Sequence, residues 1–397
     1  MTIHRRTLLS GAAAAVVPAF LPLSSRAAGV SDNEIVLGTH LDLSGPVAVA
    51  APPMRNGIQM RIDEANEKGG INGRKIKLII EDNASQPAQA VRAVDKLLKR
   101  DGVFALVAPF GTAPNVATLK RVVSSDVICF APFGATTMFR DAVGDDERLF
   151  TIYPNYDTSS YAGLKWALSN LHPKKIGFIY LEGQFGDVAL KGVKQALGER
   201  GMALTVQSGY KGGDIDFSSH VSRMRAAGVD LIFGATAPRE TAAVASELKK
   251  IGWTDVKFMS ATPGRTQIVT ALAKADAEGI YGIGSSPIIP TAQAQGAFRA
   301  WVESYKRRFG IEADDAASQF YGYADWFMTA LAATGRDVTA ANVVSALRKS
   351  NYKGFGSYEA QHFSRKNHAT PEWVQIEKVQ NGVWTKTSPL INPALTS

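Results

Sequence analysis

The chain is poor in cysteine and in long apolar runs. Its 397 residues contain one cysteine, Cys129, which excludes an internal disulfide and a cysteine-rich metal site. The six histidines are scattered without metal-ligand spacing, so no metal is expected. Beyond the N-terminal region, no stretch approaches the roughly 18 apolar residues of a membrane-spanning helix. Cys129 itself lies in an apolar run and is interpreted as a small buried core residue.

The motifs of common enzyme classes are also missing. The sequence has no Gly-x-x-x-x-Gly-Lys-Ser/Thr phosphate loop, no His-Glu-x-x-His zinc motif and no Gly-x-Ser-x-Gly nucleophile elbow. Gly282-Ile283-Gly284 begins a dinucleotide-like pattern, but Pro287 stands where the third glycine belongs. The net charge of +8 comes from scattered basic residues, which disfavours nucleic-acid binding. The sequence therefore predicts neither an enzyme nor a cofactor.

The N-terminus has the three parts of a secretory signal. Arg5-Arg6 precedes an apolar stretch of 13 residues from Gly11 to Leu23, and Ser25-Arg26-Ala27 offers small residues for cleavage. The paired arginines favour the twin-arginine route. The alternative, a membrane anchor, is disfavoured because this stretch is too short to span a bilayer. We therefore expect residues 1–28 to be a signal peptide, and the mature protein to be free in the periplasm without a lipid anchor.

Strand-like and helix-like segments alternate through two units of similar size. Strands are predicted at 34–41, 75–81, 103–108 and 126–130, with helices at 53–67, 88–99 and 115–123. The second unit has predicted helices at 159–171, 188–200, 217–226 and 240–251, and strands at 175–180, 203–206, 230–233, 257–260 and 279–282. Short connections between alternating elements predict an α/β fold with two parallel sheets.

The last third of the chain has a different pattern. Helices are predicted at 292–309, 316–333 and 340–349, followed by strands at 373–379 and 383–387. A mostly helical segment of this length cannot easily build a third core. We expect it to add layers to both units, so that the chain crosses between them more than once.

Loops of small and hydroxyl-bearing residues follow three strands of the first unit. They are Ser44-Gly45-Pro46, the segment 109–115, which contains Thr112, and the segment 131–137, which contains Thr136. Ligands of open parallel sheets bind beyond the carboxyl ends of the strands. Hydroxyl groups and free helix N–H groups at that edge suit an anion. The alternative is that Thr112 and Thr136 cap helices.

Aromatic residues accompany these loops. Phe110 and Phe133 flank the threonines, while Phe185 and either Tyr153 or Tyr156 come from the start of the second unit. Apolar walls with a few polar groups suit a small organic acid. Taken singly, each ring could equally belong to the core.

At these loops the sequence resembles the branched-chain amino acid-binding proteins of ABC importers. The resemblance is carried by Ser44-Gly45-Pro46, by Asn66-Glu67-Lys68-Gly69-Gly70-Ile71-Asn72-Gly73, by Glu81-Asp82-Asn83, by Phe185-Gly186 and by Asp216-Phe217. It extends over roughly residues 33–390. It implies a type I periplasmic binding protein with two Rossmann-like lobes, parallel central sheets and a three-stranded hinge. The implied boundaries are 29–153 plus 286–360 for the first lobe, and 154–285 plus 361–397 for the second.

The resemblance also implies a ligand site between the lobes. In the family, the loops matching Gly111-Thr112 and 133–136 hold the ligand carboxylate, an aromatic residue matches Phe185, and a ligand residue falls near Thr236. The implied partners are a small carboxylate or amino acid and a membrane permease, and the protein is expected to be a monomer. The predicted ligand-binding residues are Ser44, Phe110, Gly111, Thr112, Phe133, Gly134, Ala135, Thr136, Tyr156, Phe185, Thr236 and Thr262.

One departure from the family bears on the ligand. Amino acid binders hold the ligand ammonium with an acidic residue, which should fall near Ser260-Ala261-Thr262-Pro263, where this chain has none. Burying an unpaired ammonium would cost several kcal/mol. We therefore expect an aromatic or aliphatic carboxylate rather than leucine, with Glu182 as the residue that could rescue amino acid binding. An amino acid-binding protein and a ligand-sensing periplasmic receptor module are the alternatives.

Overall fold

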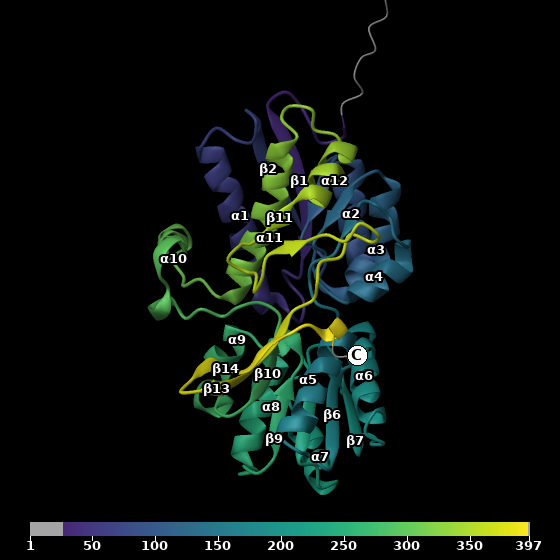
Figure 1. Ribbon diagram of the computed structural model, residues 1–397, viewed down its shortest axis with the longest axis vertical. Coiled ribbons are helices and arrows are strands. Elements are labelled where there is room, and N and C mark those ends of the chain that lie inside the picture. The colour runs from purple at the N-terminus through teal and green to yellow at the C-terminus, as the bar shows by residue number, and fades with distance from the viewer. Residues whose placement is uncertain (1–26, 396–397) are drawn as a thin grey trace, which may run out of the picture.

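The computed structural model describes residues 27–395, which form two α/β lobes built around two separate sheets (Figure 1). The predicted α/β class with two lobes is therefore confirmed. Residues 1–26 of the predicted signal peptide lie outside the described residues. Among the residues described, no helix combines the length and the apolar character needed to cross a membrane.

The first lobe contains a five-stranded parallel sheet in the order β2-β1-β3-β4-β5. Its strands are β1 (Glu34–Leu41), β2 (Lys75–Asp82), β3 (Ala105–Val107), β4 (Ile128–Phe130) and β5 (Leu149–Phe150). Its helices are α1 (Ala51–Glu67), α2 (Pro87–Lys99), α3 (Thr112–Ser124), α4 (Thr136–Val143), α10 (Gly296–Phe309), α11 (Asp315–Ala333) and α12 (Ala340–Lys349). A short antiparallel pair, β11 (Asn351–Tyr352) and β12 (Gln361–His362), packs its Tyr352 ring on Trp326 of α11.

The second lobe contains a seven-stranded sheet in the order β14-β13-β10-β9-β8-β6-β7. Its strands are β6 (Ile176–Leu181), β7 (Val206–Tyr210), β8 (Leu231–Ala235), β9 (Lys257–Ser260), β10 (Tyr281–Gly284), β13 (Val374–Gln380) and β14 (Val383–Ile391). Its helices are α5 (Tyr156–Asn170), α6 (Gln184–Gly198), α7 (Ser218–Ala226), α8 (Pro238–Lys250) and α9 (Gln267–Ala273). The strands from β6 to β10 run parallel, whereas β13 and β14 add an antiparallel edge.

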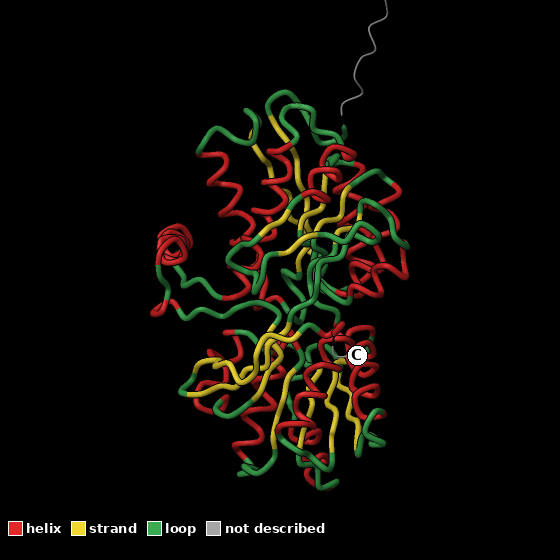
Figure 2. Tube along the Cα trace, in the orientation of Figure 1, coloured by secondary structure: helices red, strands yellow, loops and turns green. Residues whose placement is uncertain are grey.

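The chain passes between the lobes after β5, after β10 and before β13, and these linking segments meet at the waist of the molecule (Figure 2). The first and third segments pair there. The Thr151 amide donates to the His368 carbonyl at 3.0 Å, and the Thr370 amide donates to the Thr151 carbonyl at 3.1 Å. The expectation that the last third of the chain serves both lobes is confirmed, because α11 packs along α1 while β13 joins β10.

One apolar cluster continues from the first lobe into the second. It includes Ile35 of β1, Phe133 and Tyr153 at the waist, and Phe178 of β6, all at most 9% exposed. The lobes are therefore in direct contact, and the predicted carboxylate loops lie at that contact.

The predicted elements differ from the structure in a few places. The short helices α4 and α9 and the two-residue strand β5 were not predicted, and β7 lies at Val206–Tyr210 rather than at 203–206. Central strands were predicted well because burial on both faces gives them continuous apolar runs. The helices α4 and α9 are shorter than the window over which a helical period can be read, and β5 has only two residues.

Candidate ligand-binding site

Two loops at the carboxyl edge of the first sheet are joined by hydrogen bonds. The Gly111 amide, after β3, donates to the Phe133 carbonyl, after β4, at 2.9 Å, and the Phe133 amide donates to the Pro109 carbonyl at 2.8 Å. The Asn115 side-chain amide donates to both of these carbonyl oxygens, at 2.9 Å to Pro109 and 3.2 Å to Phe133. The two loops predicted to hold a carboxylate therefore form one continuous surface.

Thr112 ties the same loops together through its side chain. Its Oγ1 accepts the Ala135 N–H at 3.1 Å, and the residue is 8% exposed. The N-cap positions of α3 and α4 are occupied by Gly111 and Ala135, so neither Thr112 nor Thr136 takes the capping position that was the alternative reading. Thr136 is the first residue of α4 and is 4% exposed. Both hydroxyls thus lie where two helix N-termini begin, which is a favourable place for an anion.

Gly134 permits this close approach. Its φ is +150°, and a Cβ there would lie 2.8 Å from the Phe139 ring and 2.9 Å from Thr112 Oγ1. A larger residue would displace either the ring or the hydroxyl. The glycine therefore sets the distance between the two loops.

A row of aromatic rings leads from this surface into the second lobe. Phe110 stacks on Phe133 with ring centroids 5.5 Å apart, and Phe133 lies 4.0 Å from Tyr153. Tyr153 is 5.8 Å from Tyr156, which meets the Phe185 ring edge-on at 4.6 Å. The aromatic residues predicted as a wall are thus brought together. Phe320 of α11 also joins the row, 5.5 Å from Phe133, and nothing in its helical sequence context distinguished it from an ordinary core residue.

The two tyrosines connect hydroxyl groups of the two lobes. Burial raises the pKa of Tyr156 well above its ordinary value, an effect that its hydrogen bond with Thr112 opposes. Burial likewise raises the pKa of Tyr153 to about 12, against the opposing effect of the Thr262 and Ser285 side chains. Both phenols therefore stay neutral at physiological pH and act as hydrogen-bonding groups.

Threonines of the second lobe are placed differently from one another. Thr236, after β8, is fully buried, and its hydroxyl pairs with the Thr241 hydroxyl at 2.6 Å. That bond lies within the second lobe, and the predicted role of Thr236 in ligand binding stays a prediction. Thr262, after β9, is 2% exposed and lies beside Tyr153, so it belongs to the row described above.

Ser44 and Glu182 have other surroundings. Ser44 is exposed, and its hydroxyl donates to the Asp82 carboxylate. Glu182 is also exposed, and its carboxylate lies against Gly209 of β7. Their roles in ligand binding stay predictions.

The predicted site carries no formal charge of its own. Its members are hydroxyl, aromatic and backbone groups, and the charges of Arg265 and Asp315 act on Tyr153 from outside this set. Within residues 27–395, no group of His, Cys, Asp and Glu side chains is arranged to hold a metal ion. The site is therefore suited to a ligand held by neutral donors and apolar walls.

The fold has two lobes, each built on one sheet, and three segments link them. The candidate site of hydroxyl groups and aromatic rings lies between the lobes. This arrangement is typical of a bilobal ligand-binding protein. Residues 34–382 match the sequence profile of the family described as "Periplasmic binding protein". The chain therefore belongs to the periplasmic binding protein family, and its resemblance to the branched-chain amino acid-binding type is confirmed by its relatives.

The relatives differ in what their names say they bind. A Leu/Ile/Val-binding protein of Rhizobium johnstonii is 26% identical over 215 residues, which cover 52% of this chain and 55% of that relative. The chain thus spans little more than half the length of the curated relatives it matches. A branched-chain amino acid transporter of Thermus thermophilus with bound valine superposes with a TM-score of 0.83 at 16% identity, covering 92% of this chain and 98% of that one. A fatty acid substrate-binding protein of Thermomonospora curvata gives a TM-score of 0.81 at 22% identity, covering 92% and 94%.

Proposed function

We propose that this protein is the periplasmic substrate-binding component of an ABC importer and that it captures a small carboxylate by closing its lobes. The observation that carries the proposal is the hydrogen bond from the Ala135 amide to Thr112, because it joins two loops at the starts of helices, where we propose that an anion binds. The ligand carboxylate would lie between Thr112 and Thr136, with its apolar part against Phe133 and Tyr156. The protein would act as a monomer and deliver its ligand to a membrane permease.

Closure would move residues 29–153 plus 286–360 relative to residues 154–285 plus 361–397. The ring row supports this mechanism, since Phe133 belongs to the first lobe, Tyr153 to a linking segment and Phe185 to the second lobe. A ligand between them would contact both lobes only when they are closed. Its differential affinity for the closed arrangement would then set the closed fraction.

Charge distinguishes the two candidate ligand classes. The predicted site residues themselves include no acid, and Asp315, whose charge acts on Tyr153, is paired with Arg265. The exposed Glu182 lies against β7. A buried ammonium without a carboxylate partner would cost several kcal/mol. We therefore favour an aromatic or aliphatic acid over a branched-chain amino acid. The amino acid alternative is supported by the names of the relatives.

Titration calorimetry on protein freed of co-purified ligand by unfolding and refolding tests the proposal. Benzoate, a medium-chain fatty acid, leucine and valine form the panel. We expect saturable heat from an acid that lacks an ammonium group, and weak or no binding of leucine. Tight leucine binding would overturn the ligand class, and the absence of heat from every acid would overturn the function. Native mass spectrometry of the untreated protein would identify a retained ligand directly.

A further inference from the structure

Arg265 is a fully enclosed cation at the boundary between the lobes. It follows the turn after β9, is 2% exposed and lies across β10. A Cβ on Gly284 would lie 2.1 Å from Arg265 Nη2, and one on Gly282 would lie 2.6 Å from Arg265 Cγ. The absence of a side chain at these two glycines therefore provides the space through which the Arg265 side chain reaches the waist.

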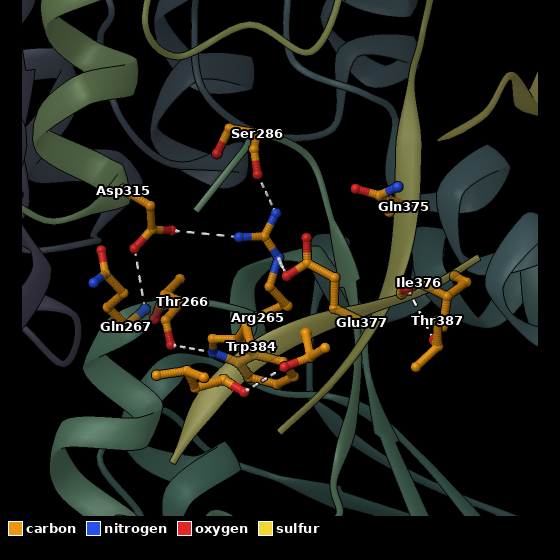
Figure 3. A network of polar contacts seen from close by, with 12 residues as sticks. Arg265, Thr266, Gln267, Ser286, Asp315, Gln375, Ile376, Glu377, Trp384 and Thr387 are labelled. Carbon is orange, nitrogen blue, oxygen red and sulfur yellow. Dashed lines mark hydrogen bonds and ion pairs between the residues drawn. The ribbon is translucent and has the colours of Figure 1, made fainter. Parts of the chain in front are cut away.

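Groups from several parts of the chain surround the guanidinium (Figure 3). Glu377 of β13 places Oε2 3.5 Å from Nε, and Asp315 of α11 places Oδ2 3.9 Å from Nη1. Nη2 donates to the Ser286 carbonyl in the second linking segment and to the Tyr358 hydroxyl at 2.8 Å. Glu377 and Arg265 both belong to the second lobe, whereas Asp315 comes from the first lobe.

Asp315 directs both carboxylate oxygens at the second lobe. While Oδ2 faces Arg265, Oδ1 accepts the Gln267 N–H, at the start of α9, at 3.0 Å. Asp315 is itself the first residue of α11, the helix that packs along α1. Asp315 thus adds polar contacts between the first-lobe helix and the second lobe to the apolar contact between them.

The charges in this network depend on one another. Burial raises the pKa of Asp315, and Arg265 opposes the rise. Burial would lower the pKa of Arg265, but Glu377, Tyr358 and Asp315 raise it above its ordinary value. A buried ion pair adds little stability relative to an apolar replacement, but removing one partner is costly because the other charge is left unpaired.

We propose that Asp315 is an inter-lobe lock, which stabilises the closed arrangement through Arg265 and the Gln267 amide. This lock rests on the proposed function, in which the lobes close on the ligand, and it adds slow ligand release as a consequence. When the lobes separate, Arg265 keeps Glu377 as its partner, while Asp315 returns to water. The lock therefore shifts the equilibrium between open and closed lobes toward the closed state. It slows ligand release without contacting the ligand.

The matched variants are Asp315→Asn and Asp314→Asn. Asp314 is the N-cap of α11, and its Oδ1 accepts the Ala317 N–H at 2.8 Å, a bond that asparagine can keep. Both variants replace a carboxyl group with an amide at the same helix start, where burial and the neighbouring Asp315 raise the pKa of Asp314 to about 7. Only Asp315 faces Arg265. Small-angle scattering without ligand and stopped-flow dissociation of a bound acid are the measurements. Thermal unfolding checks that each variant is folded.

We expect Asp315→Asn to enlarge the ligand-free radius of gyration and to speed dissociation about fivefold or more, the lower end of measured coupling between sites. Asp314→Asn should match the wild type in both measurements. Asp315→Glu, which retains the charge, should recover part of the slow dissociation and also serves if Asp315→Asn does not fold.

An Asp315→Asn variant with the scattering and dissociation rate of the wild type would overturn the lock. Equal changes in Asp314→Asn would do the same, because they would trace to the loss of a carboxyl group at the helix start rather than to the contact with Arg265. If the wild type binds no acid, the proposed function fails, but the ligand-free scattering of the variants still tests the lock independently.

Discussion

The ring centroids of Phe133 and Tyr153 lie 4.0 Å apart, so the loop after β4 rests directly on the first linking segment. Phe133 belongs to the loop that carries Ala135 and Thr136, while Tyr153 lies three residues before α5 begins at Tyr156. This contact joins the loop of the candidate site to the segment through which the chain enters the second lobe. The candidate site therefore borders the first linking segment directly.

Thr112→Val should weaken ligand binding. The change keeps the shape but removes the hydroxyl that would donate to the ligand carboxylate, and it also breaks the bond that joins the two loops. We expect a loss of roughly 1.5–3 kcal/mol in binding free energy by calorimetry. The matched control is Thr118→Val on the same helix, whose buried hydroxyl donates to the Pro114 carbonyl at 2.9 Å. Equal affinity in the two variants would argue against the assigned site.

Gly134→Ala should destabilise the protein and disturb the site together. A Cβ at φ +150° would press on Phe139 and on Thr112 Oγ1. We expect a loss of about 2–4 kcal/mol in the free energy of unfolding, from backbone strain and overpacking. Gly144→Ala is the control, since its φ is +68° but nothing lies within 4 Å of its Cβ, so only about 1–2 kcal/mol of strain is expected. Denaturant unfolding compares the two, and equal losses would contradict the crowding described for Gly134.

His40 should make the protein less stable in mild acid. Burial lowers its pKa to about 4, and its Nδ1 lies 2.8 Å from the Asn83 amide nitrogen that also donates to the Phe110 carbonyl. The unfolded chain therefore binds more protons between pH of about 6.5 and 4, so stability is lost as the pH falls through that range. His40→Asn, which offers Asn83 another acceptor, should flatten this slope. Unfolding measured from pH 4 to 7 tests it, and the same flattening in the exposed His172→Asn would count against His40 as the source.

Glu372 should make the protein less stable as the pH rises, which is the opposite of the effect expected from His40. Burial raises its pKa to about 7, with its Thr158 hydrogen bond opposing the rise, Asp157 adding to it and Arg140 opposing it. The folded chain therefore binds more protons between pH of about 4.5 and 7, so stability is lost as the pH rises through that range. Glu372→Gln should be more stable than the wild type at pH 8 by roughly 1–3 kcal/mol, and nearly equal to it at pH 4.5. Exposed Glu359→Gln is the control in thermal unfolding, and an equal gain in both variants would refute the assignment.

The sequence predicted the architecture because its signals are local. Alternating apolar runs and helical periods placed β1, α2 and β8 within a few residues of their observed bounds. The place of the loops that contain Thr112 and Thr136 could be predicted, because parallel strands present their carboxyl ends at one edge of the sheet. The prediction that both loops meet there needed no knowledge of distant contacts.

The waist network could not be predicted in the same way. Arg265, Asp315 and Glu377 are separated by at least 50 residues in the chain, and their meeting depends on how the last third folds back. One local signal was present in Gly282 and Gly284. Their spacing suggested a failed dinucleotide motif, whereas in the structure they make room for Arg265.

The most direct test of closure on a carboxylate is small-angle scattering of ligand-free protein during titration with the acid panel. We predict that at least one acid without an ammonium group lowers the radius of gyration in a saturable way. A radius that stays constant for every acid and amino acid in the panel would contradict the account.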